Sequence, residues 1–114
     1  MSTHSIIAVL QPNETVESVY CHSDGYPSFN GVKLIEHFSS YDSAVKLISG
    51  GDISCLWTNV GWDNETLPET GPLYYSSRGE RCYMWTHKNL DDFWSSRGDC
   101  SYVYLHDGDK WILA

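Results

Sequence analysis

The chain has 114 residues, 41% hydrophobic and 14% aromatic, so it can bury one core without metals or disulfides. Fifteen acidic residues against seven basic ones give a formal charge of −8, which argues against direct binding to nucleic-acid phosphates. No apolar run approaches the length that spans a bilayer, so we expect no membrane segment. We therefore expect a single globular domain over residues 1–114 in a cytosol.

The first part of the chain predicts a β-hairpin. Residues 5–10 form a short apolar run, and residues 15–20 alternate apolar and polar side chains, with mostly β-branched and aromatic members. The polar segment between them, at 11–14, contains Pro12 and Asn13 and has the composition of a turn. Two such runs joined by a short turn are typical of paired antiparallel strands.

Two short helices are expected next, side by side on one face of the sheet. Apolar residues recur at helical spacing over 32–38, where Leu34, Ile35 and Phe38 form the expected core stripe. A second amphipathic segment over 42–48 stops at a glycine pair, which is a common helix C-terminal signal. The N-cap candidates are Asn30 for the first helix and Ser40 or Asp42 for the second.

The second half of the chain adds strands around a third helix. Residues 52–57 fit a strand or an extended connector, whereas the acidic, turn-rich stretch 58–71 predicts a loop. We further expect strands over 73–75 and 82–86, a helix over 88–96, and a closing hairpin of 102–105 and 111–113 that turns at Asp107-Gly108. The order ββ-αα-ββ-α-ββ is dominated by hairpins. It predicts an α+β fold, in which two to three short helices pack on one face of an antiparallel sheet.

The cysteines and histidines give no sign of a metal or cofactor site. The four cysteines are widely spaced and form no Cys-x-x-Cys pair, so we expect free thiols. No His-x-x-x-His or His-Glu-x-x-His spacing and no phosphate-binding glycine loop occurs in the sequence. We predict neither a metal nor a cofactor.

The segment Tyr20-Cys21-His22-Ser23-Asp24-Gly25-Tyr26-Pro27 concentrates a thiol, an imidazole and a carboxylate in one turn. A cysteine nucleophile with a histidine base and an aspartate orienter is one interpretation. However, Cys21 and His22 are adjacent at a strand end, where consecutive side chains point to opposite faces. We therefore expect Cys21 in the core and predict that His22, Asp24 and Tyr26 are presented to a partner.

Two similar turns place the remaining basic candidates beside aromatic strands. Ser-Ser-Arg-Gly-Glu at 76–80 is repeated as Ser-Ser-Arg-Gly-Asp at 95–99. Arg78 and Arg97 in these turns suit a carboxylate or phosphate, and local ion pairs with Glu80 and Asp99 are the alternative. With two tryptophans of the middle region, the candidate partner- or ligand-binding residues are His22, Asp24, Tyr26, Arg78, Arg97, Trp57 and Trp62.

The arrangement of these motifs resembles a family of small uncharacterised tailed-bacteriophage proteins. Its members share a Tyr-Cys-His-x-Asp-Gly-Tyr-Pro block, a following helix, and a Gly-Asp-Ile-Ser-x-Leu box, which is residues 51–56 here. An Arg-Gly-Glu box at 78–80 and an Asp-Gly-x-x-Trp ending add to the similarity. The family often has Trp where this chain has Ser23, and Gly where it has Trp57. The resemblance implies phage origin and an accessory role in the cytoplasm of an infected bacterial host.

These features together predict a small acidic binding protein and not an enzyme. Tyrosine and tryptophan are favoured at protein interfaces, so we expect stoichiometric binding to a host protein, with inhibition of a host enzyme or anti-phage defence system. A homodimer is also compatible with the sequence. The alternative is a protein that binds or sequesters a small nucleotide signal, and a hydrolase using His22 and Asp24 ranks third.

Overall fold

The structure is a computed structural model that describes residues 3–80, 84–96 and 101–113. Its strands are β1 (Ser5–Leu10), β2 (Val16–Cys21), β3 (Ile53–Val60), β4 (Thr66–Tyr74), β5 (Trp85–His87), β6 (Tyr102–His106) and β7 (Trp111–Leu113). Its helices are α1 (Val32–His37), α2 (Tyr41–Ile48) and α3 (Leu90–Ser96), with short helical turns η1 (Pro27–Gly31) and η2 (Tyr75–Arg78). The described part of the chain contains no helix with the length and apolar character needed to cross a membrane.

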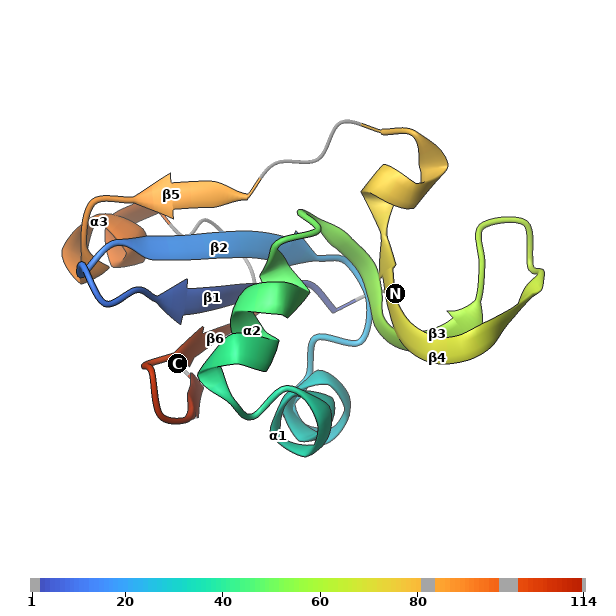
Figure 1. Ribbon diagram of the computed structural model, residues 1–114, viewed down its shortest axis with the longest axis horizontal. Coiled ribbons are helices and arrows are strands. Elements are labelled where there is room, and N and C mark those ends of the chain that lie inside the picture. Colours follow the sequence, from blue (N-terminus) through green and yellow to red (C-terminus); the bar gives the residue numbers. More distant parts are fainter. Residues whose placement is uncertain (1–2, 81–83, 97–100, 114) are drawn as a thin grey trace.

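The strands form one mixed sheet in the order β4-β3-β2-β1-β6-β7, and β5 pairs with the beginning of β2 (Figure 1). The α+β class and the β1–β2 hairpin are confirmed. The expectation of a purely antiparallel sheet is wrong, because β1 pairs with β6 in parallel and β2 meets β3 in parallel at Cys21 and Ile53. The β2–β3 contact follows a helical crossover through α1 and α2, which is the kind of connection that parallel strands need. The β1–β6 contact joins strands from opposite ends of the chain.

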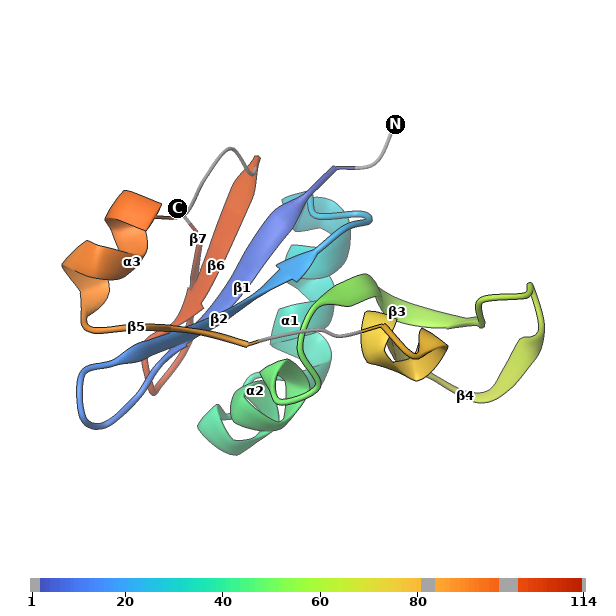
Figure 2. The same cartoon turned by 90° about the horizontal axis from the view of Figure 1, so that it is seen from above.

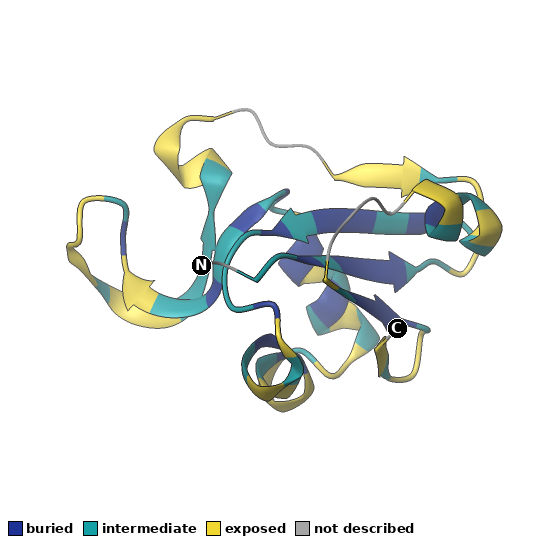
Figure 3. Cartoon of the chain, turned by 180° about the vertical axis from the view of Figure 1, so that it is seen from behind, coloured by how far each residue is buried: buried dark blue, intermediate teal, exposed yellow. Residues whose placement is uncertain are grey.

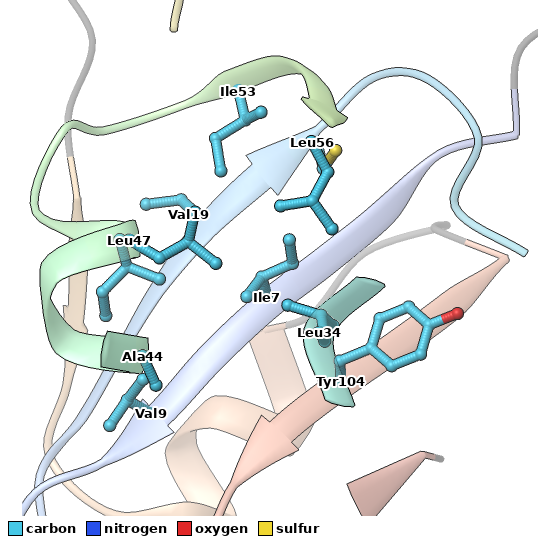
Figure 4. Close-up of a cluster of buried hydrophobic side chains, with 11 residues drawn as sticks. Ile7, Val9, Val19, Leu34, Ala44, Leu47, Ile53, Leu56 and Tyr104 are labelled. Carbon is cyan, nitrogen blue, oxygen red and sulfur yellow. The ribbon is translucent and has the colours of Figure 1, made fainter. Parts of the chain in front are cut away.

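The central strand β1 is covered on both faces. Ile7 and Val9 pack under α1 and α2 with Leu34 and Leu47, in the cluster drawn in Figure 4. Ala8 points the other way and contacts the cluster that contains Phe93 of α3. Figure 2 shows α3 on the side of the sheet opposite α1 and α2. Of the two to three helices expected on one face, α1 and α2 share that face and α3 lies on the other, because β1 is apolar at odd and even positions alike.

Helix boundaries follow the expected capping residues only in part. The Ser40 hydroxyl accepts a hydrogen bond from the Ser43 N–H at 3.1 Å and caps α2, and Gly51, with φ of 85°, follows the end of that helix. Asn30 does not cap α1. It is buried in η1, and its side-chain amide donates to the Ser23 carbonyl at 3.2 Å. Pro27 starts this extra turn before α1, so the amide of Asn30 turns inward instead.

The closing hairpin is confirmed and is attached to the helices by its buried histidine. Gly108 adopts a left-handed conformation with φ of 103° at the turn between β6 and β7. His106 is fully buried, and its Nε2 lies 2.8 Å from the Ser39 carbonyl oxygen at the α1–α2 junction. Its Nδ1 accepts a hydrogen bond from the Gly108 N–H at 3.1 Å. The two bonds fix the turn relative to the helix layer.

The acidic stretch 58–71 is mostly strand and not the expected loop. Strand β3 continues to Val60 and β4 begins at Thr66, so only residues 61–65 form the turn, where Gly61 N–H donates to the Glu65 carbonyl at 2.9 Å. This β3–β4 arm extends beyond the rest of the sheet, and much of its outer part is exposed (Figure 3). In the region of the expected strand 82–86, β5 covers 85–87, while residues 82 and 83 lie outside the described residues.

Candidate functional site

The turn that follows β2 separates its reactive groups, as alternation predicts. Cys21 is fully buried, and burial raises the pKa of its thiol to about 12. The side-chain amide of Asn30 lies 3.4 Å from its sulfur. His22 lies on the opposite face and is half-buried. A protonated, buried thiol on the far side of the strand is not available to the His22 imidazole for nucleophilic chemistry.

His22 and Asp24 also have separate partners. The Nδ1 atom of His22 lies 2.8 Å from the Tyr20 hydroxyl, and its ring packs against the His4 ring at a tilt of 30°, with centroids 4.6 Å apart. The Asp24 carboxylate accepts a hydrogen bond from the Tyr26 hydroxyl at 3.3 Å. Within the described residues no hydrogen bond joins His22 to Asp24, so the turn holds two polar pairs and no base–orienter pair.

The turn itself is held by its glycine. Gly25 donates a backbone hydrogen bond to the Thr3 carbonyl at 2.8 Å, and a Cβ atom added there would lie only 2.8 Å from the same oxygen. The Gly25 carbonyl accepts a hydrogen bond from the Tyr104 hydroxyl at 2.6 Å. The close approach of two backbone segments explains why glycine occupies this position.

Arg78 and Trp62 come together where the turn of the β3–β4 arm packs against η2. The Arg78 guanidinium lies 4.3 Å from the centre of the Trp62 ring and forms an ion pair with Glu80 at 2.6 Å. The Trp62 indole N–H donates to the Ser77 hydroxyl at 2.9 Å. The local ion pair that was the alternative for Arg78 is therefore present. Arg97, the other arginine candidate, lies outside the described residues.

Trp57 belongs to a different surface, beside α1. Its ring stacks face to face on His37, with centroids 3.9 Å apart and an interplanar angle of 9°. The Lys33 ammonium lies 6.0 Å from the same ring. Our candidate residues therefore occupy three places, at the Tyr20–Pro27 turn, between the turn of the arm and η2, and beside α1.

An apolar surface between α1 and the edge strand β7 was missed. We call it the α1–β7 surface and define it by Pro27, Val32, Ile35, Trp111 and Leu113, which line a depression of about 150 Å³ together with Gly31 and Tyr104. Val32, Ile35 and Leu113 are 42%, 65% and 48% exposed. Ile35 is therefore not a core residue as its helical spacing suggested, since only Leu34 of α1 is fully buried. The composition of the C-terminal strand, Trp-Ile-Leu, was the signal available in the sequence.

A second feature, also missed, is a pocket of about 320 Å³ on the α3 side of the sheet. It is lined by Ile6, Ser18, Val19, Tyr20, Trp85, His87, Phe93 and Ser96. His87 lies at its polar end, with Nε2 3.0 Å from the Ser18 hydroxyl and Nδ1 3.2 Å from the Ser96 hydroxyl. We call these three residues the Ser18–His87–Ser96 chain. No sequence motif could reveal it, because three separate elements supply its members.

The chemistry these surfaces offer is recognition by aromatic, apolar and neutral polar groups. In the described ranges, no group of at least three His, Cys, Asp or Glu side chains could hold a metal ion. No protein-family model matches the chain, and neither a curated protein nor a solved structure matches it. The resemblance to small phage proteins stays a prediction from the residues quoted above.

Proposed function

We propose that this protein acts by stoichiometric binding to another protein through the α1–β7 surface, and that in an infected bacterium the partner is a host protein. Inhibition of a host enzyme or of an anti-phage defence system is the biological outcome that this role would serve. The observation that carries the proposal is the exposure of three large aliphatic side chains, Val32, Ile35 and Leu113, around one depression. Clustered apolar side chains at a surface are typical of protein–protein contact sites.

The position of β7 supports the same conclusion. β7 stands at the end of the sheet order, and its pairing within the described residues is with β6. Among the described residues no strand pairs with its outer edge, so its backbone groups there can form hydrogen bonds to an added strand. Tyr26, one of the candidate residues, directly precedes Pro27 of the surface and is 38% exposed. An aliphatic centre with an open strand edge beside it suits a protein partner better than a small solute.

The net charge of the protein also indicates what kind of partner the surface would favour. The net charge of −8 gives the protein a field that favours a partner with basic residues around an apolar centre. We therefore expect a host protein with an apolar patch rimmed by lysine or arginine. Rim charges of this kind act mainly on the association rate and on its salt dependence.

The two other functions considered from the sequence have less support. Sequestration of a nucleotide through Arg78 competes with the 2.6 Å ion pair that its Nη2 atom forms with Glu80. A hydrolase that uses His22 and Asp24 lacks a hydrogen bond between these residues within the described part of the chain. The α1–β7 surface needs no such rearrangement to bind a partner.

The test begins with capture of a host protein and continues with that protein in purified form. Titration calorimetry should give a 1:1 complex, and the partner's own activity should fall in proportion to the amount of protein added. Ile35→Glu should weaken binding by at least ~30-fold, the effect expected for a central interface residue. Because Ile35 is 65% exposed, the same substitution should change the free energy of unfolding by less than about 0.5 kcal/mol.

Val60→Glu is the matched control, because Val60 is a similarly exposed aliphatic residue, 44% exposed, on the β3–β4 arm. This variant should bind like the wild type. Loss of binding in Val60→Glu with full binding in Ile35→Glu would assign the interface to the arm and refute the proposal. If sedimentation instead shows that the wild type dimerises and Ile35→Glu does not, a second copy covers the surface, and the host-protein proposal is wrong.

A further inference from the structure

The pocket on the α3 side of the sheet is independent of the α1–β7 surface, because the two lie on opposite faces of the sheet. Its volume of about 320 Å³ is at the lower end of the range of small-molecule sites, which is roughly 300–1,000 Å³. Ile6 and Phe93 supply apolar walls, and Phe93 is fully buried. The pocket is therefore sized for one compact ring system.

Aromatic side chains from β2, β5 and α3 surround this space. Tyr20 and Phe93 line it, and Trp85 lies directly across from Ser18 in the β2–β5 pairing. Trp85 is 60% exposed, so its indole stands at the rim and not in the core. Such a ring has a free face on which a flat ligand can stack.

The polar end of the pocket has a defined hydrogen-bond direction. The Ser96 hydroxyl donates to the Asp92 carbonyl oxygen at 2.6 Å, so it accepts from the Nδ1–H of His87 at 3.2 Å. In that tautomer the Nε2 atom of His87 accepts from the Ser18 hydroxyl at 3.0 Å. Ser18 is 5% exposed. Because its hydroxyl proton is already donated to His87, its oxygen can only accept a further hydrogen bond. A ligand in this pocket is best matched by an N–H donor.

The described residues that line the pocket include no lysine, arginine, aspartate or glutamate, and the protein as a whole is strongly acidic. A negative charge on the ligand would therefore meet no cation among these residues and would be repelled by the net charge. Both points favour an uncharged, planar ring with an N–H donor over a ligand that carries a phosphate. We infer that the pocket binds a free nucleobase with an exocyclic amino group, stacked on Trp85 and donating to the Ser18 oxygen.

The test is a calorimetric titration of the whole protein with adenine and with cytosine. We expect saturable binding with a dissociation constant below about 1 mM for at least one of them. N6,N6-dimethyladenine lacks the exocyclic N–H donors and should bind at least ~5-fold more weakly, the effect of one lost hydrogen bond. Adenosine monophosphate should also bind more weakly than adenine, because it adds charge.

Two pairs of variants assign the site. Trp85→Ala should weaken binding of the base by ~5-fold or more, whereas Trp62→Ala, which removes another surface tryptophan, should leave it unchanged. Ser18→Ala should lose ~5-fold, whereas Ser77→Ala, a hydroxyl on η2, should lose nothing. Because Trp85 is exposed, its variant keeps the test valid if Ser18→Ala does not fold.

Each remaining outcome would overturn the inference. If neither adenine nor cytosine binds at about 1 mM, the pocket takes no free base. If a single-stranded oligonucleotide binds more tightly than the free base it contains, the ligand of the pocket is a base within a nucleic acid. If N-acetyltryptophanamide binds as well as adenine, the pocket accepts an aromatic side chain. Ile35→Glu should leave adenine binding unchanged whatever its effect on a protein partner, so this inference and the proposed function can fail separately.

Discussion

The hydrogen bond from Tyr104 to Gly25 links the sheet to the Tyr20–Pro27 turn, and Tyr104→Phe tests how much that link contributes. Tyr104 is 3% exposed, and its hydroxyl donates to the Gly25 carbonyl at 2.6 Å. The variant removes this bond and leaves a carbonyl in a buried position. We expect a loss of about 1–3 kcal/mol in the free energy of unfolding. At roughly 4 °C per kcal/mol, the melting temperature should fall by about 4–12 °C.

The dependence of this loss on pH checks its cause. Burial raises the pKa of Tyr104 to about 12, above its ordinary value of 10.0. Below pH 10 the tyrosine is protonated in both the folded and unfolded chains, so its contribution to stability is fully present. Above that pH the unfolded chain ionises first, and the contribution is lost as pH rises toward 12. The difference in stability between wild type and Tyr104→Phe should therefore shrink in alkaline urea titrations.

Tyr102→Phe is the matched control on the same strand and face. Its ring also packs beside the main core, but its hydroxyl forms no hydrogen bond within the described residues. It should change stability by less than about 0.5 kcal/mol. A Tyr104→Phe protein as stable as the wild type, or a difference that stays constant from neutral to alkaline pH, would refute the reasoning.

Two further changes test other parts of the fold. Cys21 should resist alkylation by iodoacetamide at pH 8 in the folded protein, because burial holds its pKa at about 12. Peptide mapping should show Cys55 labelled before Cys21, and rapid labelling of Cys21 would contradict its burial. Ser40→Ala should lose about 1 kcal/mol of stability in urea unfolding, because it removes the N-cap of α2. The control is Ser49→Ala at the other end of that helix, which should lose less.

Local patterns in the sequence predicted elements well and their pairing poorly. Alternation at 5–10 and 15–20 and the Asp107-Gly108 turn predicted two hairpins that the structure contains. Nothing in these patterns states that β1 pairs with β6, because a parallel contact between distant segments leaves no periodic signal. The outer part of the β3–β4 arm was assigned to a loop because its strands bury no continuous face there, so no alternation marks them.

Sequence patterns likewise predicted some features of the candidate site and missed others. Alternation separated Cys21 from His22, as the structure confirms, and the Ser-Ser-Arg-Gly-Glu turn anticipated the ion pair of Arg78. Helical spacing placed Ile35 in the core, but α1 is short and touches the sheet along one narrow line. The 320 Å³ pocket depends on α3 lying on the second face of the sheet, which the order of elements could not establish.

The parallel pairing of β1 with β6 has a consequence for how the chain folds. Ser5 aligns with Tyr102, so the central strand of the sheet stays incomplete until residues 102–106 have been synthesised. Contacts between segments so far apart carry a large loop-closure cost and are typical of slow-folding topologies. During synthesis, the apolar residues of β1 must therefore remain exposed on that edge. We expect stopped-flow refolding to be slower than for a helical protein of the same length, and expression to depend on protection of the growing chain.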